Sequence, residues 1–339
     1  MVTYLIRRLI GAVVMLAVVS MVTFSIFFVV PRWAGATPVD MATRYVGRTA
    51  SAEMAQVAAQ RLGFLDPVIV QYGRWVKAIF VGADYDYGAG VEHCSAPCFG
   101  YSFLSRLPVW PDMLDRLPVT ASLAIGAAVI WLIAGVATGV LSALKRGSFF
   151  DRAAMSVALA GVSLPIFFTG LVSLVVFSYG NPFRVTAPGS TYTPFEQNPA
   201  TWAYNLLLPW ITLAFLYAAG YARLTRAGML ETMGEDYIRT ARAKGLPERS
   251  VVVRHGLRAA LTPIITIFGL DFGLLLGGAV LTESTFSLPG IGKYAIDAII
   301  ANDLPKVMGV TMLAAFFVVF ASLIVDLLYA VVDPRVRLS

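Results

Sequence analysis

Six long apolar stretches constrain what this chain can fold into. A membrane-spanning helix needs about 20 mostly apolar residues, because each residue rises about 1.5 Å through a hydrocarbon core about 30 Å thick. The lipid interior offers no partner for an unpaired backbone amide, so each stretch is expected to be helical. The sequence therefore predicts an all-α, polytopic membrane protein with six transmembrane helices, over residues 9–30, 119–144, 153–180, 206–222, 259–282 and 306–332.

The composition agrees with this prediction. Hydrophobic residues make up 58% of the chain and charged residues only 14%, whereas a soluble domain carries about 25% charged residues. A water-soluble enzyme and a disordered chain are therefore excluded. Within the third stretch, Pro165 is expected to kink the helix.

The first stretch has a second interpretation as a cleavable signal peptide. Arg7 and Arg8 precede it, and the small residues 34–36 resemble a cleavage site. However, the apolar run of residues 9–30 is longer than the roughly 7–15 residues of a cleavable signal. We therefore expect residues 1–30 to stay as a transmembrane helix.

Charge predicts the orientation. With six spans both termini lie on one side, and the short segments on that side hold most of the 26 Lys and Arg residues. Cytoplasmic loops collect basic residues, so both termini are expected in the cytoplasm. Residues 31–118 then form an extracytoplasmic segment, and residues 119–339 form a five-helix core with a cytoplasmic loop at about 223–258. The net charge of +6 follows from this topology, so no nucleic-acid partner is expected.

The segment 234–247 carries the signals of a short capped helix. Gly234 is predicted as the N-cap, and the acidic residues after it face the positive helix end. Gly245 is placed for a left-handed residue after the helix, and Pro247 for the start of a second helix. The sequence therefore predicts a helix–turn–helix along the membrane surface.

Two uses of this helix remain open. A basic segment at a membrane edge can simply be solvated, or attracted to anionic lipid. Alternatively, Tyr237, Ile238 and Ala241 share one side of the helix and suit a groove on another protein.

The segment resembles the cytoplasmic loop of the membrane subunits of binding-protein-dependent ABC importers. The family motif is Glu-Ala-Ala, three residues, Gly, nine residues, then Ile-x-Leu-Pro. Here residues 239–241 stand for the triplet, Gly245 for the glycine and residues 255–258 for the tail. The acidic residue and the final proline are absent. Three further blocks are similar to the peptide-permease branch, which includes oligopeptide, dipeptide and nickel importers: residues 241–246 with 254–255, residues 286–292, and residues 325–329 with 333–337.

This resemblance implies a type I ABC importer transmembrane-domain fold and a permease for peptides in the cytoplasmic membrane. It also implies a second homologous permease, two ABC ATPase subunits or one fused ATPase, and an extracytoplasmic solute-binding protein. The loop would be the coupling helix that docks on the ATPase. The residues that the resemblance assigns to coupling are Tyr237, Arg239, Thr240, Ala241, Gly245 and His255.

This chain is not expected to hydrolyse ATP or to be an enzyme. A phosphate-binding loop needs G-x-x-x-x-G-K-[ST], and the one Gly-Lys pair, Gly292-Lys293, is followed by Tyr294. We expect no cofactor on this chain, with ATP and Mg²⁺ held by partner ATPase subunits.

Two aspartates fall inside the apolar stretches. Asp271 lies near the middle of the fifth stretch and Asp326 near the end of the sixth. A carboxylate at the bilayer centre costs roughly 2.5–3.5 kcal/mol, so Asp271 should face protein or water. It is either an interhelical hydrogen-bond partner or a pathway group that contacts a peptide amine or a proton, whereas Asp326 is expected to bond locally. A proton-coupled secondary transporter that uses Asp271 is the alternative function, and an intramembrane enzyme is a weaker one.

Two smaller patterns complete the predictions. Cys94 and Cys98, next to His93, could start a metal site, but three ligands make a poor zinc site. A disulfide is the simpler interpretation on an oxidising outer face, and no metal is expected. The patterns G-x-x-x-G at 135–139 and 273–277 permit close helix packing, within the chain or at a subunit interface.

Overall fold

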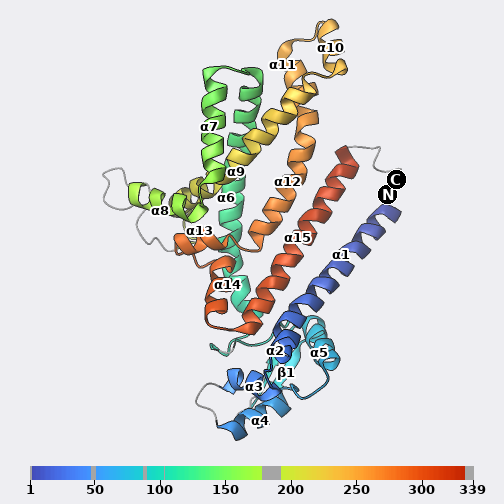
Figure 1. The fold of residues 1–339 in the computed structure, drawn as a ribbon, viewed down its shortest axis with the longest axis vertical. Coiled ribbons are helices and arrows are strands. Elements are labelled where there is room, and N and C mark those ends of the chain that lie inside the picture. The colour runs from blue at the N-terminus through green and yellow to red at the C-terminus, as the bar shows by residue number, and fades with distance from the viewer. Residues whose placement is uncertain (1, 47–50, 87–89, 103, 178–191, 333–339) are drawn as a thin grey trace.

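The computed structural model describes residues 2–46, 51–86, 90–102, 104–177 and 192–332. Two parts of the predictions, residues 178–180 of the third stretch and residues 333–337, lie outside the described residues. Within the described ranges the chain is helical apart from one two-stranded hairpin, which confirms the all-α prediction (Figure 1).

Among the described residues, five helices are long and apolar enough to cross a membrane, and a sixth span results if one bent pair is counted as a span. The bent pair consists of α7 (Phe149–Ser163) and α8 (Ile166–Phe177), which meet at an angle of 108°. The predicted kink at Pro165 is thus a full break, because Leu164 adopts an extended conformation that the residue before a proline favours. Three of the remaining spans are single helices, α6 (Val109–Leu144), α9 (Pro199–Thr232) and α15 (Leu304–Val332). The first span consists of α1 (Val2–Phe24), the π-helix η1 (Ser25–Val29) and α2 (Val30–Trp33). The span before α15 consists of α11 (Glu248–Ser250), the π-helix η2 (Val251–Leu257) and α12 (Arg258–Leu276).

The long helices extend beyond the apolar stretches. Helix α6 starts ten residues before the predicted window, with Pro118 inside it. On this extension Asp112 and Arg116 lie one turn apart and form an ion pair, with 3.0 Å between Arg116 Nε and Asp112 Oδ1. A hydropathy window stops at such charges, although i,i+4 pairs are compatible with a continuing helix.

A small module lies at one end of the molecule, between the first span and α6 (Figure 1). Its core joins Phe28 of η1 to Ala42, Ala59 and Phe64. The hairpin pairs Ala83 with Cys94 in antiparallel register. The module consists of α3 (Pro38–Val46), α4 (Ala52–Arg61), α5 (Val68–Val81), β1 (Ala83–Asp86) and β2 (Val91–Cys94).

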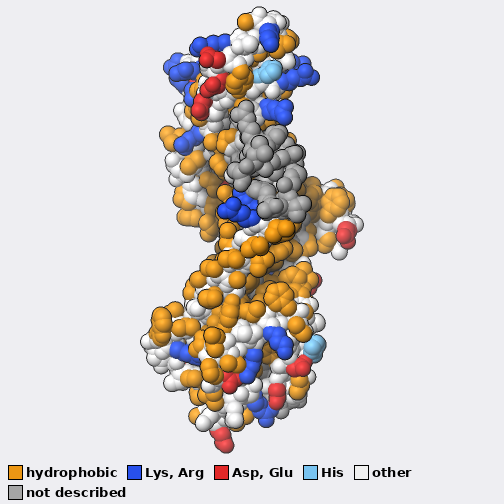
Figure 2. All heavy atoms as spheres, turned by 90° about the vertical axis from the view of Figure 1, so that its right-hand side faces the viewer, with side chains coloured by type: hydrophobic (Ala, Val, Ile, Leu, Met, Phe, Trp, Pro, Cys, Tyr) orange, Lys and Arg blue, Asp and Glu red, His pale blue; other side chains and the backbone are white. Residues whose placement is uncertain are grey.

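The opposite end carries α10 (Asp236–Ala243) and α11 (Figure 1). Figure 2 shows mostly hydrophobic side chains over the middle of one face and charged side chains towards both ends. This distribution fits a bilayer around the middle of the molecule, with each end in water.

Both G-x-x-x-G patterns pack within the chain. A Cβ atom at Gly135 would lie 2.7 Å from Cβ of Tyr221, and one at Gly139 would lie 2.5 Å from Cβ of Thr225. Both neighbours belong to α9. The second pattern faces α15, where a Cβ atom at Gly273 would lie 2.7 Å from Cβ of Ala321. The glycines therefore bring α6 close to α9 and α12 close to α15.

Two short helices connect α12 to α15. They are α13 (Val280–Thr285), which packs on α8, and α14 (Ile291–Ile300), which packs on α6 and α15. Both lie at the end of the spans nearer to β1 (Figure 1).

Candidate functional site

Helix α10 is the candidate site, because it lies at the tip opposite the module that contains β1 (Figure 1) and belongs to the loop in which the sequence predicts the coupling helix. Its N-cap is Glu235, with φ −68° and ψ 151°, and Asp236 lies in the first turn. The carboxylates face the positive end of the helix. The prediction of Gly234 as the N-cap is wrong by one residue, because the Gly234 amide donates back to the Glu231 carbonyl at 3.0 Å and stays in the turn after α9.

The inner face of α10 packs on its own chain. Ile238 is fully buried and Ala241 is 7% exposed, and both lie against Val251 of η2 with Met233 beside them. Positions three apart share a helix face, so these two residues form one apolar edge. The expectation that Ile238 and Ala241 belong to an exposed docking surface is therefore wrong, because both residues attach the helix to the spans.

The outer face of α10 is formed by Tyr237, Arg239 and Thr240, which are exposed. The Thr240 hydroxyl donates to the Asp236 carbonyl at 2.9 Å, and Arg239 forms an exposed ion pair of 3.3 Å with Asp236. Such a pair contributes little stability, so the guanidinium can exchange it for another acceptor. Partial burial and the nearby Glu235 carboxylate raise the pKa of Tyr237.

Gly245 ends the helix in the predicted left-handed conformation, with φ +73°. Its amide donates to the Arg242 carbonyl at 2.9 Å and the next amide donates to Ala241 at 3.4 Å, which satisfies the last carbonyls. Beyond the turn, Arg242 Nη2 pairs with Glu248 Oε1 at 2.7 Å. This hydrogen bond raises the pKa of Arg242. The turn is thus fastened to the start of the following span.

His255 lies half-buried in η2, one of the two π-helices of the described chain. The structure does not bring it to the exposed face of α10, because η2 meets α10 through Val251. A π-helical turn shifts the faces of a helix relative to a regular α-helix. Here η2 lies between the contact of α10 with Val251 and the regular helix α12 of the same span.

Sequence reasoning missed an ion pair between a buried carboxylate and a half-buried arginine at the same end of the molecule. Asp151, 3% exposed at the start of α7, accepts hydrogen bonds from Arg226 Nε at 2.6 Å and Nη2 at 2.8 Å. The Gly147 amide donates to the same carboxylate at 2.9 Å. This two-pronged geometry is typical of strong Arg–carboxylate pairs. The pair ties the α6–α7 turn to α9, the helix that leads into α10. The available signal was Ser148 three residues before Asp151, a helix-capping pattern.

The two aspartates within the spans have different partners. Asp271 is half-buried and its Oδ2 accepts a hydrogen bond from the Tyr221 hydroxyl of α9 at 2.9 Å. This contact supports the interhelical interpretation. Asp326 does not bond locally as expected, because Arg8 of α1 lies 2.8 Å from its Oδ2. Helices α1 and α15 run side by side, and only this tertiary packing brings the pair together.

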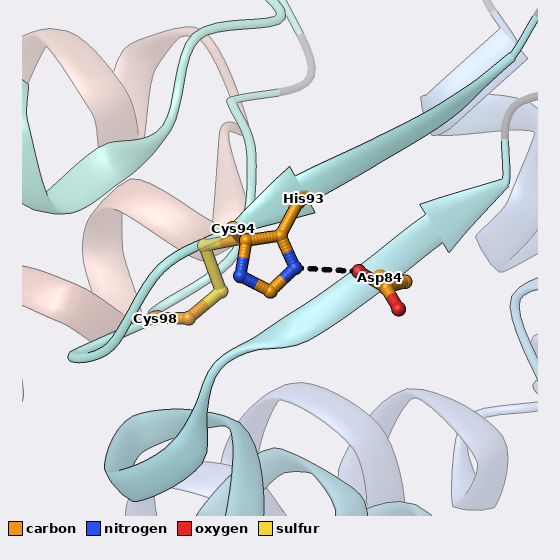
Figure 3. Close-up of a disulfide and its surroundings, with 4 residues drawn as sticks. All are labelled: Asp84, His93, Cys94 and Cys98. Atoms are coloured by element: carbon orange, nitrogen blue, oxygen red, sulfur yellow. Dashed lines mark hydrogen bonds and ion pairs between the residues drawn. A yellow bond between two sulfur atoms is a disulfide. The ribbon is translucent and has the colours of Figure 1, made fainter.

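Cys94 and Cys98 form a disulfide next to the hairpin, and Figure 3 shows a ring nitrogen of His93 facing Asp84. The His93 Nδ1 atom lies 2.6 Å from Asp84 Oδ1 across the hairpin. The two sulfur atoms are bonded to each other, so they are not free as thiolate ligands. The described residues contain no cluster of three His, Cys, Asp or Glu side chains that could hold a metal.

Comparison with known proteins places this geometry in context. Residues 135–338 match the model of the binding-protein-dependent transport system inner membrane component, and residues 1–124 match the model of its N-terminal region. A protein of Brucella abortus (strain 2308) named as a peptide transport system permease is 38% identical over 338 residues, covering 99% of both chains. The dipeptide transport system permease protein DppB of Escherichia coli (strain K12) is 41% identical over 258 residues, covering 70% of this chain and 76% of DppB.

Proposed function

This chain belongs to the family of binding-protein-dependent transport system inner membrane components, and on that premise we propose that it carries peptides and is driven through α10 by separate ATPase subunits. The chain is a permease subunit of an ABC importer. The named relatives are permeases of peptide and dipeptide transport systems, which supports a peptide as the solute. The observation that carries the coupling role is a helix that buries one face on its own chain and leaves an arginine-bearing face exposed.

In the proposed orientation, the α10 end and both termini are cytoplasmic, and the β1 module is extracytoplasmic. The basic residues on the loops at the α10 end support this choice. So does the disulfide, because disulfides persist in oxidising compartments outside the cytoplasm. The organisation into residues 1–30, 31–118 and 119–339 follows from the same orientation.

Force on α10 has a continuous path into the spans. Ile238 and Ala241 press on Val251 at the start of η2, and η2 continues into α12. Met233 connects the same contact to the end of α9, whose Arg226 is held by Asp151. Because packed interiors are nearly incompressible, a shift of α10 must be passed to α9 and α12 together.

The proposed complex contains a second, homologous permease, two ATPase subunits or one fused ATPase, and an extracytoplasmic binding protein. ATP and Mg²⁺ are held by the ATPase subunits. One α10 and six spans supply half of a symmetric pathway, and the second permease supplies the other half.

Reconstituted vesicles test this function. The complex is co-purified, its chains are identified, and uptake of a radiolabelled dipeptide is measured with and without ATP on the α10 side. We expect uptake to require ATP and the binding protein, and Arg239→Glu to reduce uptake by about tenfold through a reversed charge at the docking face. Lys145→Glu, an exposed residue at the same end, is the matched control and should retain uptake. Uptake that follows a proton gradient without ATP would contradict the proposal and favour the secondary transporter.

A further inference from the structure

Glu283 is a buried carboxylate that the coupling path does not use. It lies in α13 with no exposed surface. Its Oε1 accepts hydrogen bonds from the Thr120 hydroxyl of α6 at 2.8 Å and the Ala279 amide at 3.2 Å. Its Oε2 accepts one from the Lys293 amide of α14 at 2.9 Å. The carboxylate therefore joins α6 to the α13–α14 connection, although Thr120 and Glu283 are 163 residues apart in the sequence.

Thr120 completes the junction from the α6 side. Its side chain is fully buried, and its hydroxyl accepts a hydrogen bond from the Ile291 amide at 2.8 Å while donating to Glu283. One hydroxyl thus serves both the carboxylate and the first residue of α14. Leaving such buried partners unpaired is costly, so the arrangement favours a single geometry.

The glycines of residues 286–292 make room for this carboxylate. A Cβ atom at Gly290 would collide with the Glu283 carboxyl group, and one at Gly292 would lie 2.7 Å from the Val280 backbone. Gly278, with φ +130°, lies against the backbone of Gly292, because a Cβ atom at Gly278 would lie 2.7 Å from Cα of Gly292. The backbone of this turn therefore approaches the Glu283 carboxylate so closely that residues with a Cβ atom would not fit at these glycine positions.

We propose that Glu283 is a positioning residue that locks the α13–α14 connection to α6, so that this connection moves with α6 when α10 drives α12. The inference rests on the proposed function, because the motion is that of the transport cycle. Helix α12 leads directly into α13, and α14 packs on α15 as well as on α6. Helix α6 packs closely on α9, which belongs to the coupling path. Without the lock, α6 could move with α9 while the α13–α14 connection kept its position.

Glu283→Gln tests the lock, because the amide keeps the size of the side chain but replaces one acceptor with a donor that faces the Lys293 amide. We expect the complex to assemble normally and the number of ATP molecules hydrolysed per peptide imported to rise by about tenfold, the effect of one charge-assisted hydrogen bond on an equilibrium. Glu196→Gln makes the same chemical change at an exposed glutamate and should leave this ratio unchanged.

Thr120 provides a second, milder pair of variants. Thr120→Ser keeps the hydroxyl and should transport normally, whereas Thr120→Val removes it and should raise the ATP-to-peptide ratio as Glu283→Gln does. This pair also decides the outcome if Glu283→Gln does not assemble. The proposal would be overturned if the ATP-to-peptide ratio is unchanged in both Glu283→Gln and Thr120→Val. It would also be overturned if Thr120→Ser raises this ratio as much as Thr120→Val does.

A distance measurement separates the lock from the transport function. Spin labels at Ile125→Cys on α6 and Ile300→Cys on α14 occupy exposed positions. We expect a narrow distance distribution in the otherwise unchanged protein, which Thr120→Val and Glu283→Gln both broaden. A narrow distribution in the labelled protein and in both variants would refute the lock, even if ATP drives uptake. If the two variants broaden the distribution but neither they nor the unmodified protein import peptide, the proposed function fails and the lock stands.

Discussion

The turn after α10 gives the sharpest test of coupling, through Gly245→Val. Gly245 has φ +73°, and nothing lies within 4 Å of the place where a Cβ atom would be. The cost of the substitution is therefore backbone strain alone and involves no collision. A left-handed conformation costs an ordinary L-residue about 1–2 kcal/mol, and a β-branched residue resists it further.

This strain is large enough to displace the helix end. A loss of about 2 kcal/mol corresponds to roughly a 30-fold shift in a local equilibrium. The released turn would free Arg242 from Glu248 and let the last turn of α10 fray, so the docking face would lose its fixed orientation. We expect peptide uptake and stimulation of ATP hydrolysis by the binding protein to fall by about tenfold or more, with normal insertion and assembly.

Two variants control for effects of strain in general. Gly35→Val introduces comparable backbone strain in the turn after α2, where φ is +93° and nothing lies within 4 Å. This turn is not in contact with the coupling path, so the variant should leave coupling intact. Gly245→Asn should be close to the unmodified protein, because asparagine tolerates left-handed conformations. Equal uptake in Gly245→Val and the unmodified protein would refute the reasoning, and so would a loss of uptake in Gly35→Val equal to that in Gly245→Val.

Two further predictions concern carboxylates. Asp151→Ala leaves the Arg226 guanidinium without its two-pronged acceptor, so the thermal unfolding transition of the complex should move to a lower temperature by several degrees. An unchanged transition would show that the pair does not anchor the α6–α7 turn to α9. Asp271→Asn should retain most peptide uptake, because the amide oxygen can still accept the Tyr221 hydrogen bond; complete loss of uptake in a normally assembled complex would instead assign Asp271 to the pathway.

Periodicity and capping were sufficient to predict much of the fold. Five of the six predicted spans lie mainly on helices of the observed spans, whereas the described part of the third is divided between α7 and α8. The turn at Gly245 has the predicted conformation. These features depend on local properties, namely apolar length and the backbone freedom of glycine. The predicted kink at Pro165 was right in place but not in size, because the 108° bend depends on how α8 packs against α9 and α13.

Tertiary contacts account for what the sequence did not reveal. Ala241 has the same small side chain whether it docks on a partner or on Val251, so its burial could not be read from spacing. Asp326 and Arg8 stand at opposite ends of the chain. Glu283 follows directly after an apolar stretch and looks like an ordinary boundary charge, although the glycines of residues 286–292 signal a close backbone approach.

Crosslinking from α10 in the assembled complex tests the central claim most directly. Single cysteines replace Tyr237, Arg239 and Ala241, and each is treated with a short thiol-directed crosslinker with and without ATP. The account predicts that the first two capture an ATPase subunit with a yield that depends on ATP, and that Ala241→Cys, buried against Val251, captures none. If the two exposed positions never capture an ATPase subunit, α10 is not the element through which ATP hydrolysis drives this permease.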